Sequence, residues 1–70
     1  MDGVRKSIQL RASGTSIEAA IGEALDRAEL TLEGVDSFEV TKITGRRLEI
    51  GLEYEVELTV WFTLLDRIHG

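Results

Sequence analysis

The sequence predicts an α+β fold in which a three-stranded antiparallel sheet wraps around one amphipathic helix, in the order β-α-β-β. Two patterns carry this prediction. Apolar residues recur at helical spacing in one stretch, residues 16–32, and they alternate with polar residues in three other stretches. With 70 residues in all, the chain is expected to form a single domain over residues 1–70.

The helix is predicted over residues 16–32. Thr15 and Glu18 fit a capping box, with Ser13 as an alternative cap one turn earlier, and Gly34 is expected to end the helix in a left-handed conformation. Because half of its apolar stripe is alanine, the helix can lie close to a sheet that carries larger side chains. The stripe consists of Ile17, Ala20, Ile21, Ala24, Leu25 and Ala28.

Alternation predicts strands at residues 4–12, 37–43 and 48–64. In the second stretch the alternation slips at Ile43, which indicates a bulge or the end of the strand. Gly45, Arg46 and Arg47 are expected to form the turn into the last strand. In that strand every even position is apolar: Leu48, Ile50, Leu52, Tyr54, Val56, Leu58, Val60, Phe62 and Leu64.

The length of the last strand constrains the architecture. Seventeen extended residues span about 56 Å, whereas a compact globule of this chain length has a radius of gyration of only about 11 Å. The strand must therefore curl around the helix, break near Gly51, or reach neighbouring subunits. We expect it to lie in the centre of the sheet, paired with both other strands.

Composition narrows the classes of function. The formal charge of −5 argues against nucleic-acid binding, and neither a signal peptide nor a membrane span is evident, so a cytoplasmic protein is expected. Without cysteine, and with His69 as the single histidine, the chain offers no disulfide and little basis for a histidine metal site. A core this small contributes only about 3–5 kcal/mol without such supports, which favours homo-oligomerisation.

The order of these elements, together with their residues, resembles the dodecins. That resemblance implies a hollow homododecamer that binds flavins, riboflavin or FMN, without catalysis. The resemblance covers residues 4–64, and it is strong only when the residues that carry it are taken together. Its carriers are residues 4–8, the helical stretches 16–21 and 24–28 with Thr31 and Leu32, then Phe38, Glu39, Val40, Tyr54, Val56, Val60 and Phe62.

The resemblance also implies where a flavin would bind, and there the sequence departs from the family. Ser37 occupies the position of a tryptophan that stacks on the isoalloxazine ring. Glu55 replaces a glutamine that hydrogen-bonds the flavin edge, and Trp61 replaces a small residue. Serine has no aromatic face, and a buried carboxylate needs a partner. Trp61 lies on the same strand face as Glu55. We expect its ring to fill the space left by the missing tryptophan at position 37, to offer another stacking surface, or to pack between subunits.

Two other readings stay open. Glutamates recur on one side of the last strand, so the shell could bind cations such as calcium or magnesium through them, or arginines could neutralise them. The third class is a purely structural or interaction module. Arg46 and Arg47 could hold a ligand phosphate or simply be solvated. An enzyme is not expected, because the chain has no cysteine, no second histidine and no glycine-rich phosphate loop.

Overall fold

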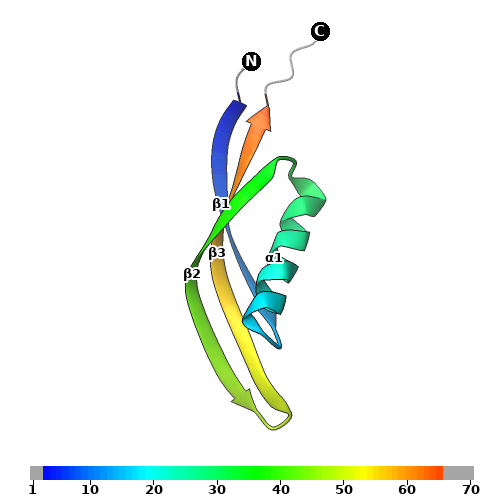
Figure 1. Cartoon of the computed structure of the whole chain (residues 1–70), viewed down its shortest axis with the longest axis vertical. Helices are drawn as coiled ribbons and strands as arrows, with labels where there is room; N and C mark the ends of the chain where they lie inside the picture. Colours follow the sequence, from blue (N-terminus) through cyan, green and yellow to red (C-terminus); the bar gives the residue numbers. More distant parts are fainter. Residues whose placement is uncertain (1–2, 66–70) are drawn as a thin grey trace.

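The computed structural model describes residues 3–65 and has one helix packed on one face of a three-stranded sheet (Figure 1). The sheet order is β1-β3-β2, and both strand pairs are antiparallel, so the last strand is central as predicted. Within the described residues no helix is long and apolar enough to cross a membrane. The elements are β1 (Gly3–Gly14), α1 (Ile17–Thr31), β2 (Val35–Leu48) and β3 (Gly51–Leu65).

The core lies between α1 and the even positions of β1 and β3. The side chains of Val56, Leu58 and Val60 in the middle of β3 are fully buried or nearly so. The alanine stripe of the helix lies directly against this face, which confirms the prediction of a close approach between helix and sheet. The buried cluster is Ala12, Ala20, Ala24, Ala28, Val56, Leu58 and Val60.

The two ends of the helix differ slightly from the prediction. The N-cap is Ser16 rather than Thr15, because the Ser16 hydroxyl accepts a hydrogen bond of 3.0 Å from the backbone N–H of Ala19. At the other end the cap residue, Leu32, is already extended. Gly34 takes the expected left-handed conformation, with φ of 73°, two residues further along. It therefore redirects the chain into β2 after the helix has ended.

The first two strands are longer than predicted, the last strand begins three residues later than predicted, and the predicted turn was wrong. Gly45, Arg46 and Arg47 lie inside β2, and the chain turns at Glu49 and Ile50 instead. The sequence has no Asn-Gly or Asp-Gly pair to mark this turn, which is followed by Gly51 at φ of 144°, a conformation that other residues rarely adopt. The predicted bulge is present as a register shift between Val40 and Lys42.

The β2–β3 hairpin extends past the end of the helix (Figure 1). The chain measures 57 × 19 × 13 Å and has a radius of gyration of 15.0 Å, well above the value for a compact globule of its length. The helix therefore covers only part of the apolar even face of β3. Leu52 on this arm of the hairpin is 51% exposed, and Ile43 on β2, in register with the buried Val56 of β3, is 48% exposed.

Candidate functional site

The sheet face opposite the helix carries the candidate site. The strand register places Trp61 on β3 directly between Ser7 on β1 and Ser37 on β2. Directly opposed side chains on neighbouring strands have their Cβ atoms about 4.5–5.5 Å apart. The structure thus brings together two of the residues singled out from the sequence, Ser37 and Trp61. The Trp61 side chain is only partly buried in the single chain.

Arg5 lies across this pair. Its guanidinium carbon is 4.9 Å from the centroid of the Trp61 ring, a cation–π contact. Its Nη2 atom donates hydrogen bonds to the hydroxyl of Ser37 at 2.8 Å and to a carboxylate oxygen of Asp36 at 3.3 Å. Because β1 and β2 lie on opposite sides of β3, the Arg5 side chain crosses the central strand to make these contacts.

Asp36 is the charged partner of this cluster. The Ser37 hydroxyl donates to its Oδ1 atom at 2.9 Å and holds the pKa of Asp36 below its ordinary value of 3.8, with Arg5 acting in the same direction. The carboxylate is therefore ionised at neutral pH, and it balances the charge of Arg5. Both side chains are about half exposed, so their ion pair contributes little to folding stability.

The sequence prediction missed Arg5 and Asp36 as parts of this site. The alternation in residues 4–12 places Arg5 on the polar face of its strand, but it does not fix the register against β3. The register needed for that inference comes from the structure, which sets Arg5 opposite Thr63 and hence diagonal to Trp61.

Glu55, the third predicted residue, lies elsewhere on the same sheet face. It is six residues from Trp61 along β3, a separation of about 20 Å at 3.3 Å per residue. Its cross-strand neighbours are Ser13 and Thr44. It contributes to a separate pocket of about 380 Å³, and within one subunit a single flavin ring cannot contact both Glu55 and Trp61. The pocket is lined by Ser13, Thr44, Gly45, Arg46, Glu53 and Glu55.

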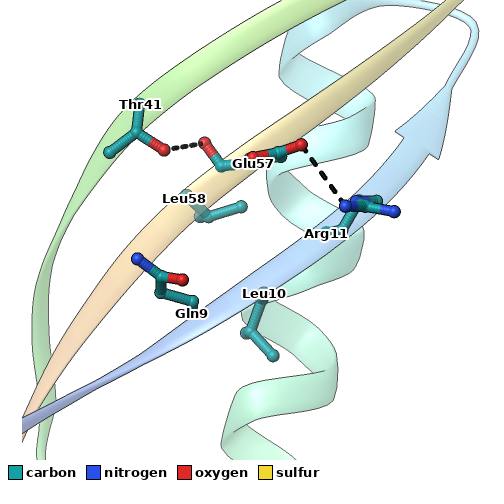
Figure 2. Close-up of a pocket in the computed structure, with 6 residues that line it drawn as sticks. All are labelled: Gln9, Leu10, Arg11, Thr41, Glu57 and Leu58. Carbon is teal, nitrogen blue, oxygen red and sulfur yellow. Dashed lines mark hydrogen bonds and ion pairs between the residues drawn. The ribbon is translucent and has the colours of Figure 1, made fainter.

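Two other glutamates of β3 have arginine partners. Arg11 on β1 lies 3.4 Å from the Glu57 carboxylate beside a pocket of about 300 Å³, where the Thr41 hydroxyl donates to the Glu57 carbonyl oxygen at 3.1 Å (Figure 2). Arg46 on β2 pairs with Glu53, which raises the pKa of the arginine. For Glu53 and Glu57 these contacts agree with the alternative in which arginines neutralise the strand glutamates.

The structure supports neither a cation site among the described acidic residues nor a phosphate site formed by Arg46 and Arg47. Among residues 3–65 no three histidine, cysteine or acidic side chains are grouped as a metal ion would require. Arg46 is paired in register with Glu53 and Arg47 with Leu52, so successive residues of β2 direct these two arginines to opposite faces. The strand geometry therefore does not direct the two arginines to one phosphate. His69 lies outside the described residues.

Comparison with known proteins gives the family. The sequence profile of the dodecins matches residues 4–65. Dodecin from Thermus thermophilus is 46% identical over 66 residues, which cover 91% of this chain and 96% of the relative. The crystal structure of an arginine-to-alanine mutant of T. thermophilus dodecin matches with a TM-score of 0.85 at 41% identity, covering 94% of this chain and all of that one.

A more distant structure shows the same fold. Dodecin from Streptomyces davaonensis matches with a TM-score of 0.83, although only 22% of the residues are identical, and it covers 94% of this chain and all of its own. The fold is thus shared across a wide range of sequences, and the family assignment rests on the profile and on the Thermus relative. The chain belongs to the dodecin family.

Proposed function

We propose that this protein is a non-enzymatic homo-oligomer, a dodecamer as in the family it belongs to, that binds and stores a flavin such as riboflavin or FMN between its subunits. The observation that carries the proposal is the pairing of Ser37 with Trp61. Position 37, where the family resemblance implies a stacking tryptophan, carries a serine. The indole of Trp61 lies on the neighbouring strand, on the same face of the sheet.

The indole of Trp61 can stack on a flavin ring in place of the tryptophan that is missing at position 37. Stacking of a base on an aromatic side chain contributes about 1–3 kcal/mol and depends on the ring, not on the strand that carries it. Moving the ring from β2 to β3 shifts it by about one strand spacing, 4.8 Å. The altered site therefore keeps its stacking platform and changes the place of the ligand relative to Glu55.

Two features support a site between subunits. The distance between Trp61 and Glu55 requires that a ligand touching both side chains take them from different subunits. The β2–β3 hairpin also exposes apolar side chains, among them Ile43, Leu48 and Leu52, for which burial against a neighbour is favourable. Assembly would thus complete the core of each chain and bring distant parts of two chains together.

The cation-binding alternative has less support than the flavin proposal. Glu53 and Glu57 already have arginine partners, so a calcium or magnesium ion would have to break those pairs. A purely structural module would leave the partly exposed Trp61 and its polar neighbours without a ligand. The two alternatives differ from the proposal in their response to added flavin and added calcium.

Native mass spectrometry of the purified protein, before and after addition of riboflavin and of FMN, tests the proposal. Twelve subunits that retain a flavin in small integer multiples are expected. Twelve subunits that retain neither flavin would refute flavin binding and leave the assembly standing, whereas a folded monomer would refute the assembly. A melting temperature raised by calcium and lowered by a chelator, with no riboflavin bound, would favour the cation-binding alternative.

A further inference from the structure

Arg5 gives the Trp61 site a charge preference. We infer that the site selects an aromatic ring that carries an anionic group, a phosphate above all, and that Arg5 is the residue that determines this selectivity. The inference rests on the proposed function, since it takes Trp61 as the stacking surface. It adds the class of ligand and a residue that neither the sequence pattern nor the resemblance to the family singled out.

The first step is geometric. The guanidinium of Arg5 lies over the Trp61 ring and is held there by Ser37 and Asp36 on the far strand. A planar ligand that stacks on the covered face of the indole has to displace Arg5 from these partners. Displacement leaves a cation within a few ångströms of the bound ring.

The second step concerns what the displaced cation can bind. An arginine side chain has five N–H donors in a planar fork that matches two oxygens of a phosphate. Nη2, which donates to both Ser37 and Asp36, takes part in both forks of the guanidinium, the one with Nε and the one with Nη1. Once a stacked ring has displaced Arg5 from these partners, a phosphate on the ligand can engage either fork with two charge-assisted hydrogen bonds.

The third step is the competition with Asp36. This carboxylate is about half exposed and lies 3.3 Å from Arg5, a long contact that a dianionic phosphate can replace at little cost. A neutral ring such as that of riboflavin also displaces Arg5, but it offers no charged partner in exchange. The site therefore distinguishes two ligands that share the same ring system by the presence of the phosphate.

Riboflavin and FMN form a matched pair of probes, because they differ only in the phosphate. Quenching of flavin fluorescence on titration with the intact oligomer gives both dissociation constants. The wild type should bind FMN at least fivefold more tightly than riboflavin. Arg5→Met should bring the ratio of the two constants close to one while the affinity for riboflavin stays the same or rises, because the cover of the indole is removed.

Lys6 provides the matched control. It is the next residue on β1, it is exposed, and its register partner is Phe62 on the opposite face of the sheet. Lys6→Met removes the same charge and should leave the FMN to riboflavin ratio of the wild type unchanged. Asp36→Asn removes the competing carboxylate and should tighten FMN binding without an equal gain for riboflavin.

The possible results separate this inference from the proposed function. Equal affinities of the wild type for the two flavins, or the same change of the ratio in Arg5→Met and Lys6→Met, would overturn the role of Arg5 and leave flavin binding intact. Failure of both flavins to bind would overturn the proposed function, and the selectivity with it. Circular dichroism and native mass spectrometry of each variant show that the fold and the subunit count are retained.

Discussion

Ser37 on β2 and Trp61 on β3 occupy directly opposed positions, and Arg5 on β1 joins them by a hydrogen bond to Ser37 and a cation–π contact to Trp61. The sheet face away from the helix thus carries an aromatic ring on its central strand and a cation above that ring. This arrangement links two of the three departures of the sequence from the family pattern, because Ser37 and Trp61 are neighbours in space.

Glu55→Gln tests whether this position contacts the flavin. The amide adds hydrogen-bond donors and removes a charge, so the affinity for riboflavin should rise by about 2- to 12-fold, the effect of one net hydrogen bond. Fluorescence titration measures the change. Glu53→Gln serves as the control, since its carboxylate is engaged by Arg46. An unchanged affinity in Glu55→Gln would place the ligand away from this residue.

Leu58 tests the coupling between core and assembly. Its side chain is 1% exposed between the helix and β3, so Leu58→Asp should unfold the chain together with the oligomer. The milder Leu58→Ala should lower the free energy of unfolding by about 2–5 kcal/mol, and Leu58→Met by less than about 1.5 kcal/mol. Urea unfolding followed by circular dichroism, with sedimentation to count subunits, checks this series. A folded, soluble Leu58→Asp monomer would contradict the coupling.

Two glycines should respond in opposite directions to alanine. A Cβ at Gly22 on α1 meets no atom within 4 Å, so Gly22→Ala should raise the free energy of unfolding by about 0.5–1 kcal/mol through helix propensity. A Cβ at Gly14 would lie 2.8 Å from the backbone nitrogen of Ala20, so Gly14→Ala should lower it by about 1–3 kcal/mol. Thermal unfolding compares the two variants. A Gly14→Ala protein as stable as the wild type would refute the packing described for Gly14, and a destabilised Gly22→Ala protein would refute the open space described for Gly22.

The sequence was sufficient to predict the elements and the alanine contact, because each depends on a local periodicity, and the length of the last strand and the element order were sufficient to place that strand centrally. The turn at Glu49 and Ile50 was not predictable in this way. Leu48 and Ile50 continue the apolar alternation of the last strand, so the pattern runs through the turn without a break. The glycine that accommodates the turn, Gly51, comes after it rather than within it.

The candidate site was also only partly predictable, but for a different reason from the turn. Ser37 and Trp61 were singled out one by one, as departures from a family pattern, but their contact depends on the register between two strands. The bulge between Val40 and Lys42 shifts that register, and its exact place is not encoded in the alternation. Arg5 needed a second register, that of β1 against β3, before it could be placed over the indole.

The central claim is that Trp61 has taken over the stacking role of the residue at position 37. The most direct test is the dissociation constant of riboflavin for the wild type, Trp61→Ala and the exchange variant Ser37→Trp/Trp61→Ala. Loss of the indole should weaken binding by about 5- to 150-fold, the worth of one stacking contact. Returning it to the neighbouring strand should restore most of that loss. Equal affinity of the wild type and Trp61→Ala would show that riboflavin does not stack on this residue and would contradict the account.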